Sequence, residues 1–287
     1  MKFYQRKAAI AIAVLAGLCA TWSCKKDNNS NNNSPAKPVV NIQVRQDATF
    51  GSIMTDSLGR TLYFFSIDAN GSSGCTGGCV TAWPVFYKDS PTLDTALSEK
   101  DFGSITRSDG AKQTTYKGWP LYYFQNDVKA GDVKGDGVGT VWFVAKPDYT
   151  VMLANIQLVG KDGVAYDHTL QPGQEVTQYI TDAYGKTLYS FSPDKFKKNN
   201  FTKSDFSNNT IWPIDSNAVI KKIPSTLDKT QFDTLMVFGK VQLSYKGWPL
   251  YYFGSDAGVR GSTKGVSVPT PGVWPYVNGS TLTAPIQ

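Results

Sequence analysis

Apolar and polar positions divide the chain into three stretches. Ala8 to Ala20 form an unbroken apolar run of 13 residues, and Lys25 to Pro38 contain no large apolar residue. From there to the end, short runs rich in Val, Ile, Thr, Tyr and Phe alternate with Gly, Asp and Asn, and no long run has a helical period. Short alternating runs between turn residues are typical of β-strands. We therefore expect an all-β body that follows a polar spacer.

Several segments carry a clear strand signal. Gly51 to Ser66 predict a hairpin with Asp56 to Gly59 as its turn, because a polar, Gly-containing stretch joins two strand-like runs. Residues 176–192 repeat this pattern, and we also expect strands at 149–156 and 235–245. This spacing predicts antiparallel sheets built from hairpins.

The chain contains an internal repeat. Residues 55–68 and 181–194 are identical at nine of 14 positions, and residues 116–127 and 245–256 are identical at ten of 12. Two further landmarks recur: Trp83-Pro84-Val85 as Trp212-Pro213-Ile214, and Val141-Trp142 as Val273-Trp274. All four keep their order at offsets of 126 to 132 residues, so the body consists of two related halves.

A shorter motif, Tyr-x-Phe-x-x-Asp preceded by Leu, occurs twice in each half. Its copies are Tyr63, Phe65 and Asp68; Tyr122, Phe124 and Asp127; Tyr189, Phe191 and Asp194; and Tyr251, Phe253 and Asp256. Because side chains alternate along a strand, the Tyr and Phe of each motif share one face, which we expect to be packed. The position between them is Phe64, Tyr123, Ser190 or Tyr252, and the serine suggests that the opposite face is more exposed.

The predicted fold class is all-β, with antiparallel hairpin-based sheets in two pseudo-repeated halves. Two similar β lobes are favoured, and a small propeller is the alternative. The expected organisation is a signal peptide at 1–23, a lipidated cysteine and tether at 24–40, a first half at 41–148, a connecting insert at 149–175 and a second half at 176–287.

The motif resembles that of secreted lipoproteins with a Yx(FWY)xxD signature, a family known as a secreted repeat of unknown function. The resemblance covers nearly all of the body. Cys75-Thr76-Gly77-Gly78-Cys79, followed by Trp83-Pro84, is similar to the usual first half of this family, whereas residues 195–209 of the second half contain no cysteine. The resemblance implies a secreted β-repeat protein and no particular activity.

The N-terminus determines the expected compartment. Three basic residues precede the apolar run and small residues lead to Cys24, which is the pattern of a secretory signal. The run is shorter than the roughly 20 residues that span a bilayer. Cys24 lies between Ser23 and a Lys-Lys-Asp stretch and resembles the lipobox of Bacteroidetes-type lipoproteins, whereas Cys19 follows a bulky Leu. We expect a lipid on Cys24 that anchors the protein to the outer membrane, with the body periplasmic or surface-exposed.

Export leaves Cys75 and Cys79 as the cysteines of the body. In an oxidising compartment we expect them to form a disulfide, and closing so short a loop contributes about 2 kcal/mol. Zinc sites need about four Cys or His ligands, and His168 is the one histidine of the chain. We therefore expect no zinc, haem or copper cofactor; a redox function of the cysteine pair is an alternative.

The four motif aspartates follow aromatic strands, where Asp commonly organises a turn by accepting from backbone amides. We expect this structural role for them. The alternative is cation binding, because Asp127, Asp132 and Asp136 lie in or beside a Gly-rich loop and hard cations prefer oxygen ligands. The spacing does not fit an EF-hand and the second half keeps only Asp256 there, so no metal site is expected.

Aromatic residues and charge narrow the class of partner. Trp-Pro pairs recur in both halves. We expect the tryptophans of four of these pairs in the core, with exposed platforms for sugars as the alternative: Trp83, Trp119, Trp212 and Trp248. Removal of residues 1–23 takes away three of 29 basic residues and none of the 23 acidic ones, which leaves an excess of three positive charges. That excess is too small to predict nucleic-acid binding.

No catalytic constellation emerges from the sequence. His168 has no counterpart in either repeat, and we find no nucleophile elbow, phosphate loop or zincin motif. We expect a non-enzymatic envelope lipoprotein, held at the membrane by its lipid, that binds or scaffolds an unidentified envelope or extracellular ligand. The alternatives are a redox protein that uses Cys75 and Cys79, and a glycan-acting enzyme that relies on paired carboxylates.

Overall fold

The computed structural model describes residues 39–286. The predicted all-β class is confirmed, because these residues form 13 strands in antiparallel sheets and one α-helix, α1 (Gly78–Ala82). The described strands form no propeller, so that alternative is not realised. None of the described helices is long and apolar enough to cross a membrane. The predicted signal peptide, the lipidation site Cys24 and nearly all of the tether lie outside the described residues.

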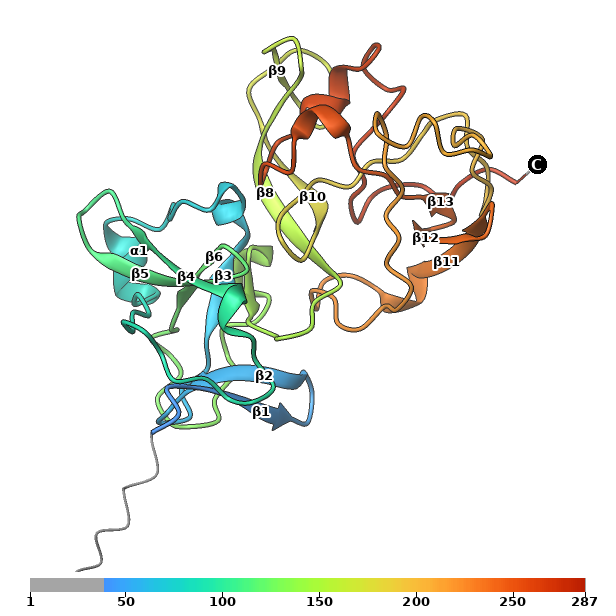
Figure 1. The fold of residues 1–287 in the computed structure, drawn as a ribbon. Coiled ribbons are helices and arrows are strands. Elements are labelled where there is room, and N and C mark those ends of the chain that lie inside the picture. Colours follow the sequence, from blue (N-terminus) through green and yellow to red (C-terminus); the bar gives the residue numbers. More distant parts are fainter. Residues whose placement is uncertain (1–38, 287) are drawn as a thin grey trace, which may run out of the picture. The chain divides into compact units, whose positions relative to one another are not determined.

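The first half contains two sheets, labelled in Figure 1. The two-stranded sheet pairs β1 (Ile42–Asp47) with β2 (Gly51–Asp56). The five-stranded sheet has the order β4-β5-β6-β3-β7. Its strands are β3 (Tyr63–Phe65), β4 (Phe102–Thr106), β5 (Lys112–Tyr116), β6 (Trp119–Tyr122) and β7 (Trp142–Val144). The motif strands β3 and β6 are neighbours, with Tyr63 opposite Tyr122.

The insert and the second half together form two three-stranded sheets, of order β10-β8-β9 and β11-β12-β13. The strands are β8 (Val151–Val159), β9 (Ala165–Tyr166), β10 (Val176–Asp182), β11 (Phe232–Val237), β12 (Lys240–Tyr245) and β13 (Trp248–Pro249). Tyr189 and Tyr251 form a β-bridge, as Tyr63 and Tyr122 do in the first half. Strand β8, within the predicted insert, lies beside β10 (Figure 1) as β1 lies beside β2.

The hairpin predicted for residues 51–66 is only partly correct. The turn forms, because Asp56 Oδ1 accepts from the backbone amides of Leu58 and Arg60 at 2.9 Å. Beyond the bridge between Thr55 and Thr61 the two strands separate. β2 pairs with β1, while β3 enters the five-stranded sheet. Residues 51–66 therefore contribute strands to two different sheets. The local alternation of apolar and polar residues cannot predict this division.

The segment predicted as a strand at 235–245 is a hairpin of β11 and β12. Phe238 and Gly239 connect the strands with φ angles of 45° and 83°. Lys117-Gly118 and Lys246-Gly247 form turns of the same kind, with φ of 49° and 77° in one and 49° and 81° in the other. Two successive positive φ angles describe the type I′ turn, which requires Gly or a similar residue and suits the twist of paired strands. This explains why Lys-Gly recurs in both halves.

The Tyr-Phe face of the motif strands is packed, as expected. The opposite face is packed in part, because Phe64 and Ser190 are buried while Tyr123 and Tyr252 are half-buried. On the Tyr-Phe face, Tyr63 and Tyr189 are inaccessible to solvent, and tryptophan pairs stack beside them, Trp83 on Trp142 at 3.8 Å and Trp212 on Trp274 at 3.7 Å between ring centroids. On the opposite face, Phe64 is buried against the ring of Trp119 at 5.4 Å. Ser190 is also buried. The small size of its side chain, and not exposure to solvent, therefore explains why a serine stands at this position.

Contacts between the halves centre on Trp119. Its indole Nε1 donates to the Ala183 carbonyl at 3.1 Å. The guanidinium of Arg260 lies 4.7 Å from the centre of the indole ring and donates to the carbonyls of Lys117 and Tyr184 at 2.5 Å each. An arginine from the second half thus joins backbone groups of both halves over a first-half tryptophan.

Candidate functional site

The motif tyrosines and aspartates form exchanged pairs. The Tyr63 hydroxyl donates to Asp127 Oδ2 at 2.7 Å and the Tyr122 hydroxyl to Asp68 Oδ2 at 2.5 Å. The second half has the same arrangement. Tyr189 donates to Asp256 and Tyr251 to Asp194, both at 2.7 Å. Each motif thus supplies a tyrosine to the aspartate of the other motif in its half.

The second carboxylate oxygen of each motif aspartate fixes a loop. Asp68 Oδ1 accepts from the Gly74 amide at 2.7 Å, and Asp194 Oδ1 accepts from the Asn200 amide at 2.6 Å. The other two aspartates accept from the amides of Lys134 and Lys264 at 2.9 and 3.0 Å. All four aspartates therefore have protein partners on both oxygens, and the motif holds its half together.

Burial changes the acidity of these pairs. It raises the pKa of both Asp68 and Asp194 to about 7, although the tyrosine and amide donors favour the charged form. The pKa of Asp256 is also raised by burial. Burial, together with the aspartate partner, raises the pKa of the Tyr122 hydroxyl well above its usual range, so the tyrosines are donors at neutral pH.

The aspartates of the Gly-rich loop do not converge on one point. Asp132 Oδ2 accepts from the Lys134 ammonium at 2.9 Å, and Asp136 Oδ1 accepts from the Val144 amide at 2.9 Å. Within residues 39–286, no group of three or more His, Cys, Asp or Glu side chains is placed to hold a metal ion.

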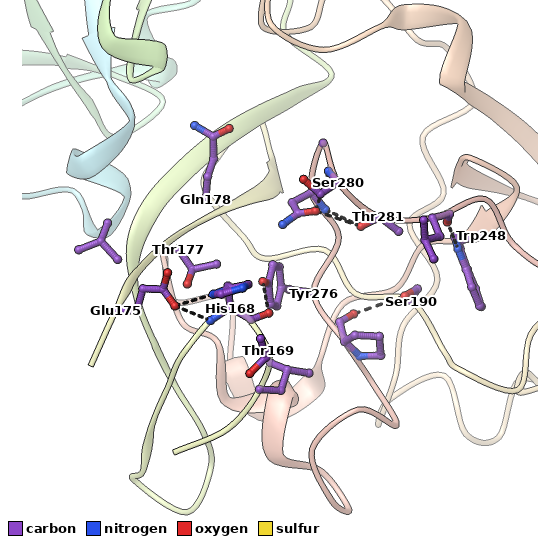
Figure 2. Close-up of a pocket in the computed structure, with 16 residues that line it drawn as sticks. His168, Thr169, Glu175, Thr177, Gln178, Ser190, Trp248, Tyr276, Ser280 and Thr281 are labelled. Carbon is purple, nitrogen blue, oxygen red and sulfur yellow. Dashed lines mark hydrogen bonds and ion pairs between the residues drawn. The ribbon is translucent and has the colours of Figure 1, made fainter. Parts of the chain in front are cut away.

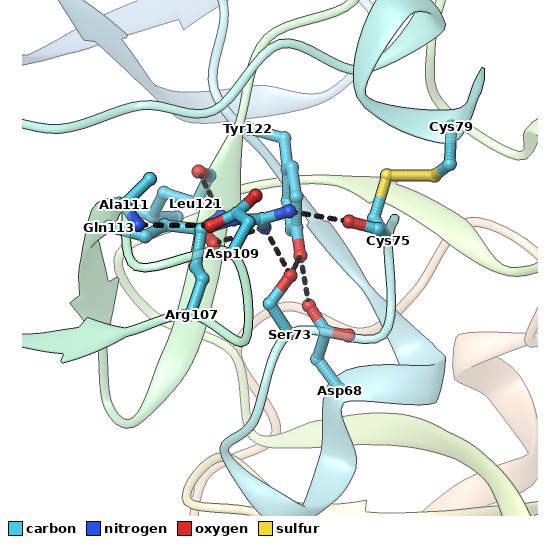
Figure 3. A network of polar contacts seen from close by, with 10 residues as sticks. All are labelled: Asp68, Ser73, Cys75, Cys79, Arg107, Asp109, Ala111, Gln113, Leu121 and Tyr122. Atoms are coloured by element: carbon cyan, nitrogen blue, oxygen red, sulfur yellow. Dashed lines mark hydrogen bonds and ion pairs between the residues drawn. A yellow bond between two sulfur atoms is a disulfide. The ribbon is translucent and has the colours of Figure 1, made fainter. Parts of the chain in front are cut away.

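Cys75 and Cys79 form a disulfide beside the Asp68–Tyr122 pair, as Figure 3 shows. Arg107, almost fully buried, connects the two features. Its guanidinium donates to the Cys75 carbonyl at 2.6 Å and also contacts Ser73 Oγ, which lies 2.7 Å from the Tyr122 hydroxyl. The disulfide loop is thus tied to the motif pair through one arginine.

The second half builds the same corner without cysteines or a cation. In the first half Arg107 donates to Gln113 Oε1 at 2.9 Å. In the second half Asn199 Nδ2 donates to Gln242 Oε1 at 2.8 Å. Asn199 also accepts from two amides of its own loop, at 2.8 and 3.0 Å. An asparagine therefore replaces both the arginine and the disulfide, which explains why only one half needs Cys75 and Cys79.

A cleft of about 660 Å³ lies on the second half. Figure 2 shows its lining, with Trp248 and Ser190 on one side of Tyr276 and His168 near Glu175 on the other. Most of its polar groups are neutral hydroxyls and amides: Thr169, Thr177, Gln178, Ser190, Asn278, Ser280 and Thr281. The Tyr276 hydroxyl donates to the His168 carbonyl at 2.9 Å.

The acidic and the basic side chain of this cleft pair with each other. His168 Nδ1 lies 2.7 Å from Glu175 Oε2, which also accepts from the His168 amide at 3.0 Å. Hydrogen bonding to Glu175 raises the pKa of His168. His168 lies in an exposed loop, as its absence from the repeats suggested, but the loop forms one wall of the cleft.

Trp248 is not the core residue that the sequence predicted. Trp83, Trp119 and Trp212 are buried, whereas Trp248 is half-buried and lines the cleft. Its counterpart Trp119 is covered at the contact between the halves. Trp248 instead donates to the Leu282 carbonyl at 2.8 Å and leaves part of its ring accessible.

Comparison with known protein families gives a match in the first half. Residues 45–87 and 103–146 match the family described as a secreted repeat of unknown function. Each matched segment of this secreted repeat contains one Tyr-x-Phe-x-x-Asp motif, so the two matches are the two partners of the Tyr–Asp exchange. Comparisons with curated proteins and with solved structures give no match.

Sequence reasoning missed several residues that now stand out. Arg107 has an aligned second-half partner, Val237, of different chemistry, and Asp215 likewise aligns with Phe86. Positions at which the two aligned halves differ in charge could therefore have indicated these residues from the sequence. Tyr276 and the C-terminal segment gave no such signal, because their place beside His168 depends on long-range folding.

Proposed function

We propose that the protein is a lipid-anchored protein of the cell envelope that binds an uncharged, hydroxyl-rich ligand, of the carbohydrate class, without acting on it. The export signal and Cys24 support the anchoring. The family of the two matched repeats is described as secreted, which agrees with export. The observation that carries the ligand class is the half-buried Trp248 in a cleft of neutral polar side chains.

The chemistry of the cleft favours a sugar over a charged ligand. Hydroxyl and amide side chains can both donate and accept hydrogen bonds, as the hydroxyls of a sugar require. The half-buried ring of Trp248 offers a flat apolar surface with a polar edge, and the mostly buried Tyr276 lies in the same lining. A volume of about 660 Å³ lies within the usual range for small-molecule sites. His168 Nδ1 is paired with Glu175, so the acidic and the basic side chain of the cleft contact each other.

The same lining supports binding without catalysis. Most glycoside hydrolases use two carboxyl groups on opposite sides of the scissile bond. Glu175 is the one carboxylate among the described residues that line this cleft, and it is held by two contacts from His168. The cleft therefore offers recognition groups without a paired acid and base.

The ligand is tested by calorimetry of the purified body with neutral hexasaccharides of glucose, mannose and N-acetylglucosamine. At least one should bind, and Trp248→Ala should weaken it tenfold or more. Ser280→Arg, which adds a bulky side chain at an exposed position of the cleft, should do the same without affecting the fold. Tyr87→Ala, an exposed aromatic outside the cleft, is the matched control. Binding that both cleft variants leave unchanged, or no binding at all, would contradict the proposal.

The anchoring is tested separately in cells. Cys24→Ser should abolish lipid labelling and move the protein from the membrane fraction to the soluble extracytoplasmic fraction. Cys19→Ser is the control and should remain membrane-bound. Recovery of the native protein with an unmodified Cys24 would contradict lipid anchoring.

A further inference from the structure

A second cavity, of about 460 Å³, is lined by residues of both halves. Three lysines and three aspartates line this cavity: Lys117, Lys186, Lys221, Asp148, Asp182 and Asp215. Its volume lies within the usual range for small-molecule sites. It shares no residue with the cleft around Trp248.

Asp215 is the most unusual residue of this cavity. It follows Trp212-Pro213-Ile214 as Phe86 follows Trp83-Pro84-Val85. The backbone places them alike, because the Phe86 amide donates to the Leu121 carbonyl and the Asp215 amide to the Leu250 carbonyl, both at 3.0 Å. Phe86 is a core residue, whereas Asp215 is 1% exposed. A carboxylate in the place of a core phenyl ring is costly to bury unless it gains a partner.

The protein satisfies only one oxygen of Asp215. Oδ1 accepts from the Asn217 amide at 3.1 Å and from its side chain at 2.7 Å. Oδ2 is buried, and no donor among residues 39–286 reaches it with hydrogen-bond geometry. The Tyr252 hydroxyl is nevertheless close enough to favour the charged form of the carboxyl group. Burial, with a contribution from nearby Asp182, raises the pKa of Asp215 to about 6, so the group is still mostly ionised at neutral pH. A buried carboxylate oxygen of this kind requires a donor or a cation.

In the first half, an arginine bonds to the aspartate of the equivalent cluster, and the second half lacks such a bond. Arg60 donates to Asp56 Oδ2 at 2.8 Å and to the Tyr123 hydroxyl at 2.9 Å, and thereby closes that cluster with a cation. The corresponding residues of the second half are Lys186, Asp182 and Tyr252. The Tyr252 hydroxyl lies 3.4 Å from Asp182 Oδ2, and the Lys186 ammonium makes no such bond within the described part of the chain.

Lysine side chains line the same cavity. Burial lowers the pKa of Lys117. The carboxylates of Asp101, Asp148 and Asp182 oppose this shift, whereas the ammonium of Lys221 adds to it. Lys221 is exposed, so its ammonium can reach a ligand. The lining of the cavity thus contains the carboxylates of Asp182 and Asp215 together with the ammonium groups of Lys117 and Lys221.

We propose that this cavity binds a zwitterionic molecule of the amino-acid class. Its ammonium group occupies the place that the Arg60 guanidinium has in the first half and donates to Asp215 and Asp182. Its carboxylate pairs with Lys117 and Lys221. The two charges of the ligand match the carboxylates and the ammonium groups of the cavity lining, and charge-assisted hydrogen bonds of this type are strong when partly buried.

The test uses the body of the protein and each of the 20 standard L-amino acids in turn, followed by calorimetry with the best binder. At least one should bind with 1:1 stoichiometry. Analogues of that amino acid without the amino group, or without the carboxyl group, should bind at least tenfold more weakly. Failure of all 20 to bind would overturn the proposal, as would equal binding of an analogue with only one charge.

Variants locate the binding. Asp215→Asn should weaken it tenfold or more, and Asp215→Phe, which restores the first-half residue, should abolish it. Lys221→Gln should also weaken binding. Because Lys221 is exposed, this substitution should not disturb the buried cluster around Asp215. Asp89→Asn is the control, because Asp89 is exposed and lies outside this cavity. Amino-acid binding that Asp215→Asn and Lys221→Gln leave unchanged would overturn the assignment, whatever the outcome of the sugar experiment.

Discussion

The Tyr251 hydroxyl donates a 2.7 Å hydrogen bond to Asp194 Oδ2, although the two residues are 57 positions apart and belong to different copies of the motif. Tyr189 and Asp256 form the reciprocal bond at 2.7 Å. A single motif therefore cannot satisfy its own aspartate. This explains why the motif occurs in pairs, and it assigns the most recurrent residues of the chain to folding.

Stability should decrease between pH 5 and pH 8. The folded-state pKa of Asp68 and Asp194 is about 7, above the usual value of about 4 for an unfolded chain. Between these values the folded protein binds more protons than the unfolded chain, so the free energy of unfolding falls as the pH rises through the folded-state pKa. Urea unfolding at several pH values measures this. The variants Asp68→Asn and Asp194→Asn should each flatten the slope, and Asp89→Asn should not. A free energy of unfolding that rises towards pH 8 would contradict the assignment.

Substitution of either of two equivalent glycines should destabilise the protein. A Cβ at Gly135 would lie 2.8 Å from the Tyr63 ring and 2.9 Å from the Trp83 ring, and a Cβ at Gly265 would meet Tyr189 and Trp212 at 2.7 and 2.9 Å. Because these rings are buried, the clash cannot relax into solvent, and overpacking of this kind costs about 1–3 kcal/mol. Gly135→Ala and Gly265→Ala should both lower the urea midpoint accordingly. Gly78→Ala is the control, since nothing lies within 4 Å of its Cβ position; equal effects of all three would refute the packing argument.

Removal of the disulfide should have a modest cost. Cys75→Ser together with Cys79→Ser should lower the free energy of unfolding by about 2 kcal/mol, because the bond closes a very short loop and Arg107 still holds the Cys75 carbonyl. Ligand binding by the second half should persist. If the pair is instead a redox centre, its reduction potential should fall near the values of catalytic thiol proteins, about −120 to −270 mV, and not below about −300 mV as in structural disulfides. Titration against a glutathione or dithiothreitol buffer distinguishes the two.

The class of the fold was accessible from the sequence because it depends on local signals. Alternating aromatic runs, the turn signal at Asp56 to Gly59 and a self-alignment were enough to predict antiparallel sheets in related halves. The path of the chain between sheets was not accessible, since Tyr63 to Phe65 continue from a hairpin yet pair with β6 and β7. The choice depends on which distant strand buries the aromatic face, and periodicity does not contain that information.

The candidate sites were less accessible than the fold. The motif residues were found, but the exchange of Tyr and Asp partners joins positions 54 to 67 residues apart. Trp119 and Trp248 are identical in local sequence, and only their tertiary surroundings make one a core residue and the other part of a cleft. By contrast, the replacement of Phe86 by Asp215 is visible in the aligned halves and would have indicated a site.

The exchange of motif partners is tested most directly by a double-mutant cycle in urea at pH 8, where Asp68 is largely ionised. The single and double variants of Tyr122→Phe with Asp68→Asn should give a coupling energy of about 1 kcal/mol or more, as expected for a direct hydrogen bond to a charged group. The same cycle for Tyr122→Phe with Asp127→Asn, two residues of one motif, should give less than about 0.5 kcal/mol. A larger coupling within the motif than between Tyr122 and Asp68 would contradict the exchanged arrangement.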